Sequence, residues 1–114
     1  MATTGYKKGL WAETFAKFYM RLQGYRVLAE RFKTPVGEID LVVKKGRQLV
    51  FVEVKLRETA AAAAEAIHAR NRSRVSRAAE LYLQKHPEYT GWELRFDALV
   101  LAPWAWPRHI RNAW

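Results

Sequence analysis

Three acids and a lysine interrupt two apolar runs in the stretch GEIDLVVKKGRQLVFVEVK, residues 37–55. Glu38 and Asp40 lie in the first run, and Glu53 and Lys55 close the second. Carboxylates that meet across two strands repel each other, so a proton, a lysine or a divalent cation must compensate. Mg²⁺ favours one or two carboxylates together with waters and a substrate phosphate. Asp40 and Glu53 around such an ion, with Lys55 beside it, would suit phosphodiester hydrolysis.

Each group has a definite role in that chemistry. The ion would polarise a phosphoryl oxygen and lower the pKa of a bound water. Lys55 would orient that water and stabilise the charge that develops on the phosphate. The competing interpretation is a hairpin held by cross-strand Glu–Lys pairs, because an acid two residues before a lysine is common in a chain with this many charges. The residues alone leave both interpretations open.

The two runs, 38–43 and 49–56, are predicted to pair as a β-hairpin. Gly46 and Arg47 suit a two-residue type II′ turn, in which glycine supplies the positive φ. This turn would pair Lys45 with Gln48, Asp40 with Glu53 and Glu38 with Lys55. A four-residue loop, 44–47, would instead shift the pairing by two residues and make Glu38 face Glu53.

Either turn places the acids and Lys55 on one face of the hairpin, because side chains alternate along a strand. A three-residue loop would put the acids on opposite faces. The other face of the hairpin is expected to belong to the core, with Ile39, Leu41, Val43, Val50, Val52, Val54 and Leu56.

A helix is predicted at residues 8–23, with Gly24 as the glycine that ends it. One apolar stripe of this helix consists of Trp11, Phe15, Phe18 and Leu22. The other stripe contains Glu13 together with Gly9, Ala16 and Met20. A helix that is apolar on two sides is covered on both, so we interpret Trp11, Phe15 and Phe18 as a dimer surface. Glu13, among small residues, is expected to lie close to another element.

A strand is predicted before the hairpin, at residues 25–32. A helix over residues 59–85, which ends before Pro87, and a strand at residues 92–101 are predicted after it. A mobile connection is the alternative for the alanine-rich start of this helix, residues 60–64. The tail, residues 103–114, is rich in aromatic side chains and is expected to pack against the body of the protein. The resulting order α-β-β-β-α-β predicts an α/β fold with a central mixed β-sheet flanked by helices.

The 114-residue chain has a formal net charge of +9 and no cysteine. Its length suits a single domain, residues 1–114, and the lack of cysteine excludes disulfides and thiolate catalysis. No apolar run approaches the roughly 20 residues of a membrane helix, and the N-terminus lacks the apolar segment of a signal peptide, so we expect a cytoplasmic protein without membrane contact. Such a basic surface attracts polyanions, most commonly nucleic acid. Anionic lipid and a solubilising charge are the alternatives.

Arg70, Arg74 and Arg77 fall on one side of the second predicted helix, with Arg72 around the turn. We interpret these arginines as a stripe that contacts DNA phosphates, which positions a duplex without reading its sequence. A solvated helix face is the alternative. Asp97 ends an alternating strand pattern, and the residues around it do not fix its role.

The chain closely resembles the YraN-like family of small bacterial proteins in the segments AETFAKFYM, GEIDLVV, LVFVEVKLR, RAAELYL, RFDALVL and HIRNAW. That family is similar to the restriction-endonuclease-like PD-(D/E)xK nucleases and, in its pattern, to archaeal Holliday-junction resolvases. The resemblance implies that Asp40 is the motif aspartate and that Glu53 and Lys55 form the (D/E)xK element. It also implies that Glu13, on the first helix, completes the metal site. Glu38 is expected to support the metal ligands or to replace one of them.

Two positions depart from the pattern. Ile39 precedes the aspartate where the name-giving motif has proline, and Asn71 stands where many relatives have a lysine, which puts full activity in question. The expected function is Mg²⁺- or Mn²⁺-dependent endonuclease cleavage of structured or branched DNA. Resolvase-like cleavage needs two symmetric sites and therefore a homodimer. The alternatives are a non-catalytic nucleic-acid-binding module and an interaction protein with an acidic partner.

Overall fold

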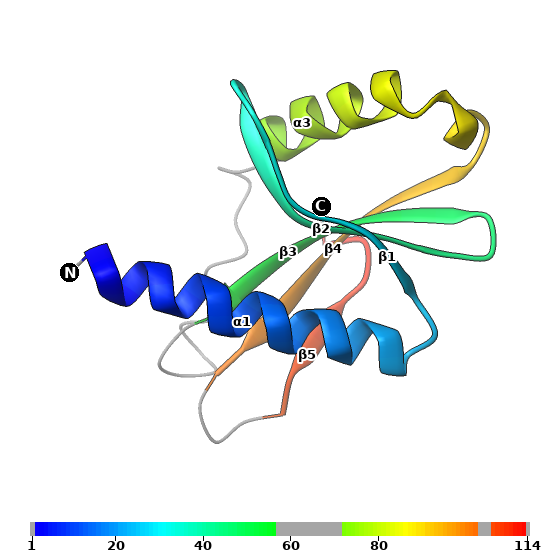
Figure 1. Ribbon diagram of the computed structural model, residues 1–114. Helices are drawn as coiled ribbons and strands as arrows, with labels where there is room; N and C mark the ends of the chain where they lie inside the picture. Colours follow the sequence, from blue (N-terminus) through cyan, green and yellow to red (C-terminus); the bar gives the residue numbers. More distant parts are fainter. Residues whose placement is uncertain (1, 57–71, 103–105, 114) are drawn as a thin grey trace.

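The computed structural model describes residues 2–56, 72–102 and 106–113. Within the two helices, side chains are described from Trp11 onward in the first and from Arg74 onward in the second. A five-stranded sheet lies between two helices that cover opposite faces (Figure 1). The elements in chain order are α1 (Ala2–Leu22), β1 (Arg26–Thr34), β2 (Gly37–Lys45), β3 (Gln48–Leu56), α3 (Arg72–Lys85), a 3₁₀ turn (Pro87–Tyr89), β4 (Glu93–Leu101) and β5 (Arg108–Ile110).

The α/β order and the mixed sheet are confirmed. The strands follow the order β1-β2-β3-β4-β5, in which β3 and β4 are parallel and the other neighbours are antiparallel. The tail adds a strand that the sequence did not predict, because β5 pairs with β4 and so packs against the body as expected. This arrangement agrees with the restriction-endonuclease-like fold that the resemblance implied. None of the described helices is long and apolar enough to cross a membrane.

The helix boundaries follow the local signals in the sequence. α1 begins earlier than predicted and ends at Leu22, where Gly24 adopts the left-handed φ of 95°. α3 ends at Lys85, before Pro87 as predicted. The predicted earlier part of this helix, residues 59–71, lies outside the described residues. The positions of Arg70 and Asn71 are therefore not described either.

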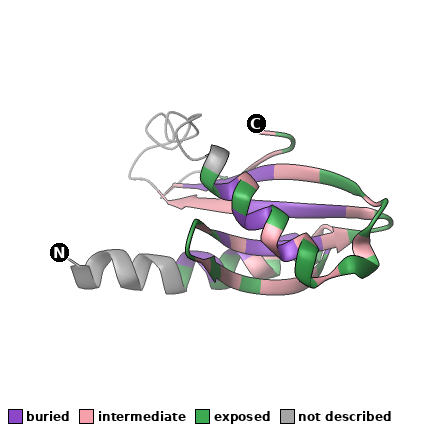
Figure 2. Cartoon of the chain, turned by 90° about the horizontal axis from the view of Figure 1, so that it is seen from above, coloured by how far each residue is buried: buried purple, intermediate pink, exposed green. Residues whose placement is uncertain are grey.

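The sheet separates two apolar clusters, and buried residues follow its central strands (Figure 2). The cluster under α1 contains Ala12, Ala16, Met20, Tyr25, Leu41, Val43, Val50, Val52, Leu99 and Leu101. The cluster under α3 contains Ile39, Val42, Leu49, Phe51, Val75, Ala78, Ala79 and Tyr82. Small residues on α1 allow that helix to approach the sheet closely, and this closeness positions the acid on its inner side.

The prediction that Ile39 shares a face with Leu41 is wrong, because Ile39 packs under α3. The alternation of β2 breaks at Asp40. Within the described strands, β1 and β2 pair on both sides of this position but leave Asp40 and Arg31 out of the pairing. Odd-numbered residues of β2 therefore face α1 after Asp40, as Leu41 and Val43 do, and face α3 before it, as Ile39 does.

The hairpin has the predicted two-residue turn, with Lys45 paired to Gln48 and a φ of 62° at Gly46. The four-residue loop is thereby excluded. The predicted pairs of Asp40 with Glu53 and of Glu38 with Lys55 are wrong, because the pairing of β2 with β3 ends at Leu41 and Val52 within the described strands. Beyond this point Asp40 Oδ2 accepts a hydrogen bond from Val54 N at 2.7 Å. The carboxylate of Asp40 thus accepts the hydrogen bond that a main-chain carbonyl of β2 would accept in a continuous hairpin.

Gly37, the glycine of the GEID segment, lies against the first turn of α3. A Cβ atom there would lie 2.5 Å from the carbonyl oxygen of Arg74. Because the obstacle is backbone, we expect Gly37→Ala to lower the free energy of unfolding by about 1–3 kcal/mol in urea titrations. Gly91→Asn is the control, since asparagine tolerates a positive φ and its Cβ would meet no described atom within 4 Å. Equal stability of Gly37→Ala and wild type would contradict this packing.

Candidate metal and phosphate site

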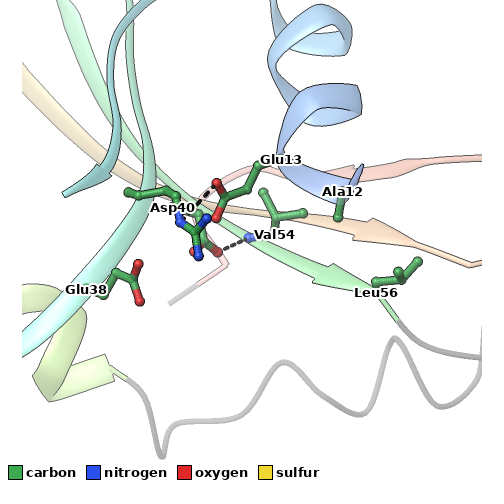
Figure 3. A pocket seen from close by; sticks show the side chains of 7 residues that line it. Ala12, Glu13, Glu38, Asp40, Val54 and Leu56 are labelled. Atoms are coloured by element: carbon green, nitrogen blue, oxygen red, sulfur yellow. Dashed lines mark hydrogen bonds and ion pairs between the residues drawn. The ribbon is translucent and has the colours of Figure 1, made fainter. Parts of the chain in front are cut away.

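Asp40 stands where the hairpin opens, and two pockets of about 210 Å³ each meet there. The pocket under α1 is lined by Ala12, Glu13, Arg31, Glu38, Asp40, Val54 and Leu56 (Figure 3). The pocket under α3 is lined by Glu38, Asp40, Glu53, Arg74 and Val75. Asp40 and Glu38 therefore belong to both pockets.

Glu13 reaches the sheet from the inner side of α1, as predicted. It lies next to Ala12, which is buried, and is itself only 8% exposed. Glu13 and Asp40 line the same pocket, where burial raises the pKa of Asp40 and the charge of Glu13 raises it further. The small residues of α1 thus place an acid against the open end of the hairpin.

Glu53 and Lys55 follow Phe51 along β3 at two-residue spacing, which places them on the face covered by α3. Lys55 Nζ lies 2.8 Å from Glu53 Oε2. The structure therefore brings Asp40 together with Glu13 on one side and with Glu53 on the other. Among the described residues, no three acids or histidines lie close enough to hold a metal ion as the side chains stand.

Burial raises the pKa of Asp40 to about 7, against the effect of the hydrogen bond from Val54, and the charges of Glu13, Glu53 and Glu38 raise it further. Burial also raises the pKa of Glu13 above its usual value, although the charge of the nearby Arg31 offsets part of this effect. The charged form of Asp40 is thus costly in this structure. A bound cation would relieve this cost, because an opposite charge favours the ionised carboxylate.

Arg31 is a pocket residue that the sequence prediction missed. Its Nε lies 3.4 Å from Glu13 Oε1. Arg31 also has a φ of 52°, which is uncommon for a residue other than glycine. An arginine in a strand that already contains several basic residues gives no signal of this position, so only the tertiary structure could reveal it.

The structure describes the side chains of two of the four arginines in the predicted stripe, Arg74 and Arg77. Arg74 lines the pocket under α3 beside Asp40 and Glu53. Arg77 is exposed further along α3. Arg70 lies outside the described residues, as does the side chain of Arg72.

The donor atoms fit a hard divalent cation. Every candidate ligand is a carboxylate oxygen, which suits Mg²⁺ or Mn²⁺, and two carboxylates are enough when waters complete the coordination. Asp40 with Glu53, or Asp40 with Glu13, would supply such a pair, since the two members of each pair line the same pocket. Glu38 is exposed and lines both pockets, so it lies beside either pair of carboxylates.

Asp97 has a structural role, away from both pockets. Its side chain is fully buried and accepts hydrogen bonds from Arg95 Nε and Nη2, both at 2.9 Å, from His109 Nε2 at 2.6 Å and from Asn112 N at 3.0 Å. Arg95 Nη2 also donates to the hydroxyl of Tyr25. This cluster fastens β5 to the sheet and to the end of α1.

The apolar stripe predicted on α1 lies on one side of the helix, and this side is exposed. The exposed fractions are 58% for Trp11, 38% for Phe15, 56% for Phe18 and 86% for Leu22. The rings of Trp11 and Phe15 stack with their centroids 5.9 Å apart. Their contact with a second subunit stays a prediction.

Comparison with known proteins decides the family. The model of the uncharacterised protein family UPF0102 matches residues 12–101. The chain belongs to this family. A UPF0102 protein of Methylorubrum extorquens is 55% identical over 93% of this chain and 83% of its own length. UPF0102 proteins of Parvibaculum lavamentivorans and Nitrobacter winogradskyi are 51% and 43% identical, over 96% and 99% of this chain and 82% and 96% of their own lengths.

The YraN-like resemblance is thereby confirmed, since it named the same family. The residues matched to UPF0102 include Glu13, Asp40, Glu53 and Lys55. They also include the RFD segment, residues 95–97. The family match therefore spans the candidate site and Asp97, while His109 and Asn112 lie beyond its end.

Proposed function

We propose that this UPF0102 protein is a divalent-metal-dependent endonuclease that acts on structured or branched DNA. The observation that carries the proposal is the position of Asp40. It stands where the hairpin opens and lines the pockets on both sides of the sheet. Burial makes its negative charge costly, and three further carboxylates raise that cost. A divalent cation is the partner that best compensates such a group.

The residues divide the work of phosphodiester hydrolysis. Asp40 would hold the ion together with Glu53 or Glu13, and the bound ion would activate a water and polarise the phosphate. Lys55, which is held 2.8 Å from Glu53, would position the attacking water and stabilise charge on the phosphate. Arg74 would bind a neighbouring phosphate at the edge of the pocket. The net charge of +9 would attract DNA to this surface.

Calorimetric titration of Mn²⁺ tests the metal site. Wild type should bind Mn²⁺ saturably, and Asp40→Asn should lose this binding while it keeps the hydrogen bond to Val54. Lys55→Met should still bind Mn²⁺ but should cleave branched or flapped DNA about 100-fold more slowly or worse. Glu93→Gln is the matched control, because Glu93 is exposed and bonded to Gln48 at the far end of the sheet. Equal, weak binding by wild type and Asp40→Asn would contradict the site.

A non-catalytic nucleic-acid-binding module is the second candidate. It is favoured by the ion pairs of the pocket acids, because the cations Arg31 and Lys55 already accompany Glu13 and Glu53. This candidate predicts DNA affinity that falls with salt but is the same in wild type and Asp40→Asn. The nuclease predicts that Ca²⁺ strengthens DNA binding by wild type and not by Asp40→Asn.

A further inference from the structure

Two consecutive residues of β1 contact the same helix, which a regular strand does not allow. Lys17 of α1 lies 3.2 Å from Glu30, and Glu13 of α1 lies 3.4 Å from Arg31. Side chains of neighbouring strand residues normally point to opposite faces. The φ of 52° at Arg31 and the omission of Arg31 and Asp40 from the pairing of β1 with β2 explain the exception. An uncommon backbone conformation thus directs Arg31 into the acidic pocket.

The contact of Arg31 with Glu13 is an ion pair without good hydrogen-bond geometry. Arg31 Nε is buried, yet it forms no hydrogen bond within the described part of the chain. A guanidinium has five N–H donors in a fixed planar arrangement, and a buried donor without an acceptor is unfavourable. The side chain of Arg31 is 34% exposed, so solvent reaches it in this position.

Arg95 provides the contrast within the same protein. It donates two hydrogen bonds of 2.9 Å to Asp97, and its side chain is only 14% exposed. Arg95 is therefore fixed in the structural cluster by two hydrogen bonds of good geometry. Arg31 neutralises its acid from a more exposed position and with poorer geometry, as expected of a cation that can leave.

We propose that Arg31 is an exchangeable counter-ion of the acidic pocket, which holds Glu13 until a divalent cation binds and then contacts the phosphodiester. The second half rests on the proposed function. Glu13 and Asp40 line the same pocket as Arg31, so a divalent cation on these carboxylates would repel the guanidinium and remove its partner. The released guanidinium would stand at the same pocket with its planar donors available, which suits bidentate contact with phosphate oxygens.

This exchange implies that Arg31 competes with the metal ion for Glu13. It also implies that metal binding strengthens DNA binding through the released guanidinium. Arg31→Asn removes the cation and keeps a residue type that tolerates a positive φ. Calorimetry should show Mn²⁺ binding about 5-fold tighter or more in this variant than in wild type, a coupling of ordinary size. Fluorescence anisotropy in Ca²⁺ should show weaker binding of branched DNA by a similar factor. Neither readout requires cleavage.

Two further variants separate charge from shape. Arg31→Lys keeps the positive charge but loses the planar donors, so Mn²⁺ affinity should stay near that of wild type while DNA affinity in Ca²⁺ falls. Lys17→Gln removes the cation of the neighbouring ion pair between α1 and β1, outside the pocket, and should change neither affinity more than twofold. Circular dichroism would establish that each variant is folded before titration.

The outcomes are distinct. Mn²⁺ binding that is equal in wild type and Arg31→Asn would overturn the counter-ion, and the proposed function would stand. Tighter Mn²⁺ binding with unchanged DNA affinity would overturn the contact with phosphate. Failure of Mn²⁺ to bind either protein would overturn the metal site, and the exchange with it.

Discussion

The Asp40→Asn variant is expected to be more stable than wild type at pH 8 and equally stable near pH 4, when no metal is present. Folding raises the pKa of Asp40 from 3.8 to about 7, mainly through burial. Between these values the folded protein binds more protons than the unfolded chain, so wild type loses stability as the pH rises from about 4 to 7. Asparagine avoids that loss. Each pKa unit corresponds to about 1.4 kcal/mol, so the full shift sets a ceiling of about 4.5 kcal/mol for the difference at pH 8. Because Asp40 is only half-buried, solvent should reduce this difference to about 2–4 kcal/mol.

Urea titrations at pH 4, 6 and 8 in the presence of a chelator would measure this difference. Mn²⁺ should then stabilise wild type at pH 8 and leave Asp40→Asn unchanged, because the ion binds only the ionised carboxylate. Glu93→Gln is the control for removal of an exposed acid that lines neither pocket. A stability difference between Asp40→Asn and wild type that is constant from pH 4 to 8 would show that Asp40 is not buried at a raised pKa.

The Asp97→Ala variant is expected to lose about 3–5 kcal/mol of unfolding free energy, because it removes a fully buried acid and leaves the half-buried Arg95 without its partner. Burial by itself would raise the pKa of Asp97, but the hydrogen bonds from His109, Arg95 and the main chain of Asn112 outweigh it and lower the pKa. The stabilisation is therefore present above the usual pKa of an aspartate and is lost as the pH falls through the lowered value. Wild type should accordingly lose this contribution in acid.

Thermal and urea unfolding at pH 7 would measure the loss. Glu93→Ala is the matched control, since Glu93 is an exposed acid at the start of the same strand and its removal should cost well under 1 kcal/mol. Asp97→Ala that remains folded should still bind Mn²⁺ like wild type, because Asp97 lines neither acidic pocket. A folded Asp97→Ala protein that no longer binds Mn²⁺ would contradict a purely structural role.

Local patterns in the sequence were enough to predict the elements and the turn. Two-residue alternation and Gly46 specified the hairpin and its register near the turn, and Gly24 and Pro87 marked the ends of the helices. The spacing along α1 separated an exposed aromatic stripe from an inner face with Glu13. These features depend on neighbours within a few residues, which is why the chain itself determines them.

Only the tertiary structure decided how the acids meet. The pairing of β2 with β3 ends before Asp40, so Glu13 and Glu53 approach it from opposite sides of the sheet instead of across a continuous hairpin. The partners of the charged groups also come from distant segments, as Arg31 does for Glu13 and His109 for Asp97. Such contacts depend on how helices and strands pack against one another. No local periodicity encodes them, because each joins residues far apart in the chain.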